Sequence, residues 1–264
     1  MSVFFILIIG IIYLIIYSPF FQIKNINIEW IKEKKESKQL NNEFFIQDLK
    51  NNFIKQAKFI KFLGANNILI WKEKVPENIF KIYPQITELI IEKNYFKREI
   101  KLIIQERQKT GIWCFKTQIK IDETTNVSMQ INANEFLTSC WWFDKKGIIF
   151  EQAPLIEGSL INKINDFSGR NIQVGESVLE KELFLNLLKI FEMLEKINLN
   201  IKSFRMERIE LQEIITESSP EIYFSLRIDP LFALPVFESI KNIGLKKIEY
   251  IDLRMENRVY YKPK

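Results

Sequence analysis

The chain has 264 residues, a formal net charge of +5 and 47% hydrophobic residues, which is typical of a globular protein of one to three domains. Histidine is absent, which excludes an imidazole base, a Ser-His or Cys-His nucleophile pair and nearly all zinc enzymes. The positive charge is mild and scattered, and does not indicate nucleic-acid binding. We expect no cofactor and no metal.

The first 23 residues carry no charged side chain. An apolar helix extended to Phe21 would span roughly 30 Å, which matches the hydrocarbon core of a bilayer. Residues 18–21 do not resemble the small-residue site at which signal peptides are cleaved. We therefore predict an uncleaved transmembrane anchor over residues 1–21, a single membrane span. Lysines follow this segment and none precedes it, so charge alone leaves the orientation open.

The pattern of apolar and polar residues over 22–108 predicts a small α+β module. The segment 22–30 alternates apolar and polar residues as a strand does, and 42–57 carries an apolar stripe with helical spacing. Pro76 suits the start of a short helix that Pro84 ends. Two further strands, 86–93 and 98–108, are joined by a hairpin loop. The predicted order is strand, helix, helix, strand, strand.

From Thr110 the pattern changes, and residues 109–264 predict a larger, mostly antiparallel β domain with packed helices. The capping box of Ser177 and Glu180 predicts the start of a helix, and Gly244 is expected to end a second one. The turn at 144–147 places Gly147 where a left-handed residue is needed. The helix that follows the capping box is expected to bury Leu183, Leu187, Ile190, Phe191 and Leu194. Strands are expected at 112–121, 136–143, 148–151, 201–215, 221–228, 248–253 and 258–262, with a polar loop at 122–134.

The two cysteines, Cys114 and Cys140, lie in predicted strands that could be neighbours. A disulfide is one interpretation, in an oxidising compartment. The other, which we favour, is two separate buried thiols, because strand register cannot be read from the sequence. The neighbouring Trp113, Trp141 and Trp142 are interpreted as core residues.

The chain contains no phosphate-binding loop, dinucleotide fingerprint or nucleophile elbow. Asp144 lies in a predicted turn, and Asp252 lies in a predicted strand close to Arg254. Both carboxylates are interpreted as structural partners rather than as an acid and a base.

Several short motifs occur in a fixed order. They are the strand at 21–28, Gly-Ala-Asn-Asn-Ile-Leu at 64–69, the strand pair from Pro84 that ends in Glu106-Arg107, the aromatic-Asp-x-x-Gly hairpin at 142–150, Pro-Leu-Ile-Glu-Gly at 154–158, and Ile-Asp-Leu-Arg at 251–254. In this order the chain resembles the FtsQ/DivIB family of bacterial cell-division proteins over nearly its whole length. After Arg254 that family often has an aromatic residue and a turn with Gly, and residues 255–258 have neither.

The resemblance implies a POTRA domain over 22–108 and a β domain over 109–264. It further implies a non-enzymatic scaffold, anchored in the cytoplasmic membrane with its bulk on the extracytoplasmic side at the division septum. Such a scaffold binds FtsB-like and FtsL-like bitopic division proteins and helps to control septal peptidoglycan synthesis. No small-molecule substrate and no nucleic acid are expected as partners.

The expected partner site is the final strand, placed at a sheet edge to which an extended segment can add. Its predicted residues are Arg254, Met255, Arg258, Val259, Tyr260 and Tyr261. Arg254 is expected to hold an acidic partner residue, and Arg258 and Lys262 are expected to form a basic rim. Because Tyr260 and Tyr261 point to opposite faces, one is expected to pack on the core while the other meets the partner. The alternative is an ordinary terminal strand whose Lys262 and Pro263 protect the edge against aggregation. Two other function classes stay open, a POTRA-bearing adapter of envelope export or assembly and a membrane-tethered envelope hydrolase that uses carboxylates.

Overall fold

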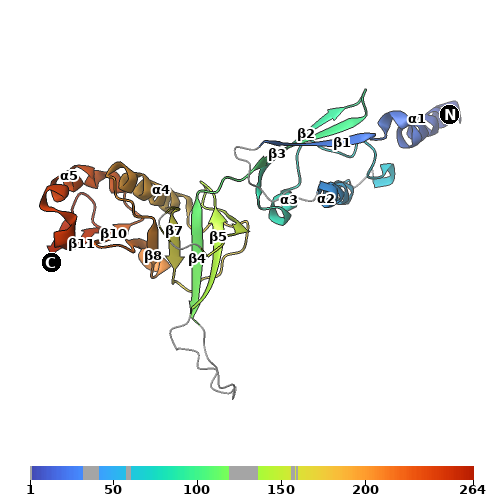
Figure 1. Ribbon diagram of the computed structural model, residues 1–264. Coiled ribbons are helices and arrows are strands. Elements are labelled where there is room, and N and C mark those ends of the chain that lie inside the picture. The colour runs from blue at the N-terminus through green and yellow to red at the C-terminus, as the bar shows by residue number, and fades with distance from the viewer. Residues whose placement is uncertain (1, 32–41, 58–60, 119–135, 156–157, 159) are drawn as a thin grey trace, which may run out of the picture. The chain divides into compact units, whose positions relative to one another are not determined.

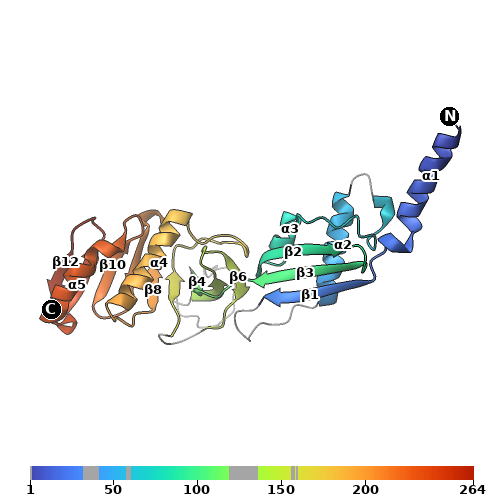
Figure 2. The same ribbon diagram turned by 90° about the horizontal axis from the view of Figure 1, so that it is seen from above.

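The computed structural model describes residues 2–31, 42–57, 61–118, 136–155, 158 and 160–264. The fold is α+β, the class that the sequence indicates. The chain divides into two compact units, residues 1–107 and 108–264, and each contains its own sheet (Figures 1 and 2).

The first unit has the element order strand, helix, helix, strand, strand that the sequence predicts after residue 22. Its sheet has the order β1-β3-β2, with β1 parallel to β3 and β2 antiparallel to β3. The elements are α1 (Ser2–Tyr17), η1 (Pro19–Phe21), β1 (Asn25–Ile31), α2 (Asn42–Gln56), η2 (Lys61–Leu63), α3 (Glu77–Ile82), β2 (Ile86–Asn94) and β3 (Glu99–Glu106).

The core of this unit lies between α2 and one face of the sheet. Phe45, Leu49 and Phe53 stand one helical turn apart on α2 and are buried. They belong to one cluster with alternate residues of β3, whose burial has the period of two that a strand imposes. The periodicities read from the sequence therefore place the correct faces inward.

The predicted transmembrane anchor is wrong. The helix α1 covers 16 residues, or about 24 Å at 1.5 Å per residue, and Pro19–Phe21 form a separate 3-10 turn rather than extending it. Among the helices of the described residues, none combines the length and apolar character needed to cross a bilayer. The single-pass membrane localisation inferred from this segment is wrong with it.

The second unit contains a nine-stranded sheet in the order β12-β11-β10-β9-β8-β7-β4-β5-β6. Its elements are β4 (Gly111–Gln118), β5 (Phe136–Phe143), β6 (Ile149–Gln152), β7 (Lys163–Asp166), α4 (Lys181–Lys196), β8 (Ser203–Met206), η3 (Ile209–Leu211), β9 (Glu213–Thr216), β10 (Glu221–Ser225), η4 (Pro230–Ala233), α5 (Leu234–Ile243), η5 (Leu245–Lys247), β11 (Ile248–Leu253) and β12 (Tyr260–Pro263).

This sheet is mixed: among its described strands five of eight pairs are antiparallel, as expected of a mostly antiparallel domain, and three are parallel. Strands β4 and β7, β7 and β8, and β10 and β11 pair in parallel. Neighbouring parallel strands need a crossover connection, usually a helix. Here α4 links β7 to β8 and α5 links β10 to β11.

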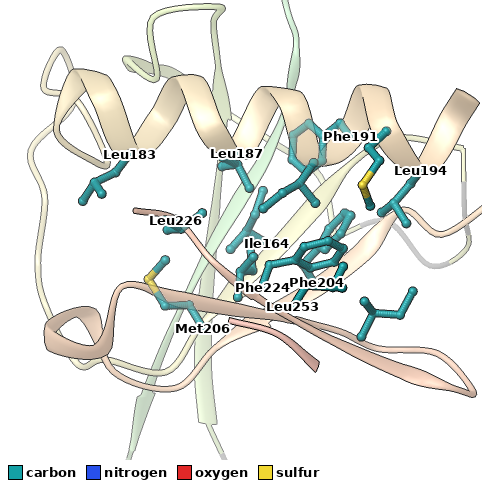
Figure 3. Packing of buried hydrophobic residues seen from close by; sticks show 14 of the residues in the cluster. Ile164, Leu183, Leu187, Phe191, Leu194, Phe204, Met206, Phe224, Leu226 and Leu253 are labelled. Atoms are coloured by element: carbon teal, nitrogen blue, oxygen red, sulfur yellow. The ribbon is translucent and has the colours of Figure 1, made fainter. Parts of the chain in front are cut away.

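The helix α4 packs along the middle of the large sheet (Figure 3). The apolar stripe predicted from the sequence, from Leu183 to Leu194, is buried. The capping box is wrong: α4 begins at Lys181, and no side chain caps it. Ser177 instead forms a bridge with Ile148, which draws residues 177–178 into the neighbouring hairpin.

Two further differences from the sequence predictions concern strands. The run 201–215 is divided into β8 and β9, because η3 and the left-handed Gln212 (φ 52°) lie between them. The strand β7 was not predicted at all, since its four residues Lys-Ile-Asn-Asp lack apolar alternation. The predicted loop 122–134 lies outside the described residues.

The two cysteines form a disulfide, which corrects the interpretation as separate thiols. Cys114 and Cys140 face each other in the antiparallel pair of β4 and β5. Trp113 is fully buried as predicted, whereas Trp141 and Trp142 are half-buried.

Gly147 gives a sharp test of this packing. Its φ is +78°, and a Cβ there would lie 2.7 Å from the Phe184 ring of α4. We expect Gly147→Ala to destabilise the protein by about 2–4 kcal/mol, through left-handed strain and overpacking together. Gly169 has a similar φ of +72° with open space around it, so Gly169→Ala should cost only about 1 kcal/mol. Urea denaturation measures both, and equal losses would contradict the role of the Phe184 contact.

Candidate partner-binding edge

The last two strands form the end of the large sheet. Strand β11 pairs in parallel with β10 and antiparallel with β12, which has no further neighbour in the described part of the chain. A bulge between Ile248 and Tyr250 inserts one extra residue, so that Ile248, Ile251 and Leu253 are all buried. The burial of these residues fixes the position of β11 in the sheet. Strand β12 is held in place by its pairing with β11.

The connection between β11 and β12 is a tight turn. Asn257 adopts a left-handed conformation with φ of 59°, which asparagine tolerates better than most residues. The N–H of Arg258 donates to the carbonyl of Met255 at 3.2 Å. Asparagine thus occupies the left-handed position of this turn, which contains no glycine.

Arg254 is held by carboxylates of its own chain. Its Nη2 lies 2.6 Å from Asp252 Oδ2 and its Nε lies 2.9 Å from Asp252 Oδ1, while Nη1 lies 3.1 Å from Glu213 on β9. Its guanidinium also lies over the Tyr223 ring, 5.1 Å from the centroid. The side chain predicted to hold an acidic partner residue is therefore engaged in structural pairs.

These ion pairs shift the pKa values of Asp252 and Arg254 in the directions expected for an acid and a base that stabilise each other's charge. Hydrogen bonds from Arg254 hold the pKa of Asp252 below its ordinary value, and the hydrogen bond to Asp252 is the main reason that the pKa of Arg254 is raised. The interpretation of Asp252 as a structural partner of Arg254 is confirmed.

The same face of the sheet carries a second ion pair. Arg205 on β8 donates to Glu221 on β10 at 2.8 Å, and Glu221 also accepts from the Tyr223 hydroxyl at 2.7 Å. The hydrogen bond from Arg205 is the main cause that lowers the pKa of Glu221. Tyr223 is thus shared between the two ion-pair groups, and the face opposite α4 is a connected polar surface.

The hydrogen bond from Lys264 N–H to Lys247 carbonyl, at 2.9 Å, shows which way the backbone of β12 points. Along an antiparallel strand, residues turn both backbone groups alternately toward and away from the neighbouring strand. Tyr260 and Lys262 therefore face β11, whereas Tyr261 directs its N–H and C=O to the free edge. Pro263 also lies on the outward side but has no N–H to offer.

The predicted site residues differ in how accessible they are. Met255, Tyr260 and Tyr261 are 52%, 48% and 44% exposed. Val259 is half-buried and packs against the core of the second unit. The Arg258 side chain is exposed, and its Nη1 donates to the Tyr260 hydroxyl at 3.4 Å. The expectation that one of the two tyrosines packs on the core is wrong, since each is almost half exposed.

Sequence reasoning missed the residues that complete this edge. Glu213 and Tyr223 come from strands far away in the sequence, and only their cross-strand neighbours show that they meet Arg254. Glu249 holds Lys262 at 2.7 Å and so engages one of the two cations predicted to rim the edge. The alternation of the sequence 248–253 signals the strand but not these partners.

Comparison with known proteins adds no further assignment. No family model matches the chain, and no curated protein matches it.

We expect Asp252→Asn to loosen the hairpin of β11 and β12. The loss should be about 1 kcal/mol at neutral pH, since the pair is bidentate but partly exposed. Because folding lowers the pKa of Asp252, its contribution is complete above about pH 4 and is lost as the pH falls through the lowered value. The difference in stability between the variant and the natural protein should therefore shrink as the pH is lowered below about 4. Amide exchange at Tyr260 and Lys262 measures the effect, with Glu256→Gln in the exposed turn as control, and a pH-independent difference would contradict it.

Proposed function

We propose that this chain is a non-catalytic scaffold of the bacterial division machinery, similar to the FtsQ/DivIB proteins. In this proposal it binds an extended segment of an FtsB-like protein, and with it an FtsL-like protein, and so helps to control septal peptidoglycan synthesis. The observation that carries the proposal is the open edge of β12, with Tyr261 directing its backbone groups away from the sheet.

The first unit supports the comparison with a POTRA domain. It has two helices between its first and second strands, and its third strand lies in the centre of the sheet, parallel to the first. The motifs that carry the family resemblance occur in both units. A shared fold does not by itself give a function, so the proposal depends on the edge rather than on this unit.

An added strand would use both backbone and side-chain contacts at β12. Tyr261 offers one N–H and one C=O, and these main-chain bonds do not depend on the partner's sequence. Tyr260 shares its side of the sheet with Asp252, and Tyr261 shares the other side with Ile251. A partner segment would therefore meet one tyrosine on each side, which is where specificity can arise.

The charge of this edge favours an acidic or polar partner segment. Arg254 and Lys262 are each paired with carboxylates of the chain. In the described residues, the Arg258 guanidinium has no carboxylate within ion-pair distance. We therefore assign to Arg258, rather than to Arg254, the contact with a partner carboxylate.

Proline at position 261 tests the strand addition. Tyr261→Pro removes the outward N–H without breaking a bond to β11, so binding of a synthetic peptide from an FtsB-like protein should weaken roughly tenfold. Tyr261→Phe keeps the backbone donor and should retain most of the affinity. Tyr260→Pro is not suitable, since Tyr260 faces β11 and its loss would damage the hairpin. Calorimetric titration gives the affinities, and thermal unfolding confirms that the variants fold.

Amide exchange gives a second readout on the natural protein. The Tyr261 amide should exchange faster than those of Tyr260 and Lys262, and should become protected when the peptide binds. Binding that the proline variant leaves unchanged would rule out this edge. A natural protein that does not bind the peptide would rule out the partner class.

A further inference from the structure

The small sheet of the first unit has an edge that differs from the others. Strand β1 lies at one end of the order β1-β3-β2, and it is seven residues long and contains no proline. In the described part of the chain, no strand pairs with its outer side along Asn25–Ile31. Such an edge is a template for another strand unless the protein protects it.

The backbone groups that reach this edge can be identified from neighbouring bonds. The carbonyl of Phe21 accepts from Ile68 N–H and the N–H of Ile23 donates to Asn66 carbonyl, each at 2.8 Å, on the outer side. Lys24 N–H points the other way and donates to the carbonyl of Arg98. Alternation then directs the backbone groups of the odd-numbered residues 25, 27, 29 and 31 outward.

The side chains beside this edge are incompletely covered. Ile26, Ile28 and Trp30 face the core but stay half-buried, whereas Leu89 and Ile91 on β2 are fully buried. The apolar flank of β1 is therefore left partly open to water. A strand added beside β1 would cover it.

The remaining edges are protected or already assigned. On β2, Glu88 and Glu92 are exposed and a bulge interrupts the strand. On β6, the carbonyl of Glu176 accepts from Ile149 N–H, and Ile149 carbonyl accepts from Gly175 N–H. The edge of β12 is the one proposed above for the division partner. Only β1 combines length, open backbone groups and uncovered apolar side chains among the described strands.

We propose that β1 pairs antiparallel with β1 of a second copy of this chain, about a two-fold axis through Ile28. In this register Ile28 faces Ile28, and Ile26 faces Trp30, so the apolar side chains meet one another. On the other face Asn27 lies opposite Glu29, an amide opposite a carboxylate. No pair of like charges is brought together along the seven residues.

The backbone direction agrees with this register independently of the side chains. The pairs Asn27 with Glu29 and Asn25 with Ile31 join residues whose N–H and C=O both point outward, as hydrogen-bonded pairs require. Ile28 and its copy then form a non-hydrogen-bonded pair, in which side chains lie closest. The segment Asn66–Ile68 occupies the outer side only up to Ile23, before this ladder begins.

The other edge of the same sheet shows what would prevent such pairing. If β2 paired with its own copy about Ile90, Glu88 would face Glu92 twice and four carboxylates would be opposed. Like charges directly opposite each other destabilise strand pairs. The difference between β1 and β2 therefore specifies which edge two copies would share.

Charge substitution at an exposed position of β1 tests the proposal on the full chain. Asn27→Glu would place carboxylates opposite Glu29 in both halves of the dimer and should raise its dissociation constant about tenfold. Asn27→Gln should leave it unchanged. Ile90→Glu adds the same charge to the other edge of the sheet and should have no effect. Sedimentation equilibrium up to about 0.5 mM covers the micromolar to millimolar range expected for one strand pair.

A cysteine pair tests the register. In a non-hydrogen-bonded antiparallel pair the Cα atoms lie about 4.5 Å apart, close enough for a disulfide. Ile28→Cys should therefore give a covalent dimer under mild oxidation. Ile26→Cys should give little, because its counterpart is Trp30 of the second copy. Circular dichroism checks that both variants fold.

Each of these measurements either supports or contradicts the pairing of β1 with β1 of a second copy. A dimer that Asn27→Glu weakens and Ile28→Cys cross-links supports the proposal. A monomer at all concentrations, a dimer insensitive to Asn27→Glu, or equal cross-linking at positions 26 and 28 would overturn it. Loss of peptide binding at β12 would not affect these measurements, so this proposal is tested separately from the proposed function.

Discussion

The burial of α4 on the large sheet is the constraint on which the second unit depends. Its apolar stripe covers alternate residues of the central strands, including Ile164, Phe204 and Phe224 (Figure 3). Because side chains alternate along a strand, covering one face determines which residues point to the other. The polar face with Arg205, Glu221 and Arg254 is a consequence of this burial.

A buried carboxylate strengthens the same region. Asp166 on β7 is almost fully buried, accepts from Trp113 Nε1 at 2.9 Å and pairs with Arg170 at 2.8 Å. Arg170 also donates to the carbonyl of Val178, just before α4 begins. A buried charge is tolerated only when it is paired and hydrogen-bonded, and here the pairing joins the sheet to the segment that leads into the helix.

Both proposals follow from sheet edges that the chain treats differently. The edges of β2 and β6 are blocked by charge, a bulge or a covering loop, as is usual where a free edge would lead to aggregation. The edges of β1 and β12 keep backbone groups directed outward, with exposed or half-buried apolar side chains beside them. Since Pro263 and Lys262 shorten the usable part of β12, this edge suits a short partner segment, whereas β1 offers a longer ladder.

The sequence by itself determined the elements whose signal is local. The stripe of Leu183 to Leu194, the buried face of α2 and the order of elements in the first unit all follow from periodicity, and so does the strand of residues 248–253. Predictions from local sequence patterns failed where contacts with distant segments determine the local structure. Ser177 pairs with Ile148 instead of capping α4, and β7 is stabilised by buried polar contacts.

Only the tertiary structure decided the register, the parallel pairs and the partners of each charge. It joined Cys114 to Cys140 and satisfied Arg254 with Asp252 and Glu213. It also showed that Tyr261, and not Tyr260, directs its backbone to the edge. The physical reason is that periodicity shows which residues share a face, whereas pairing depends on which strands become neighbours and in which direction they run.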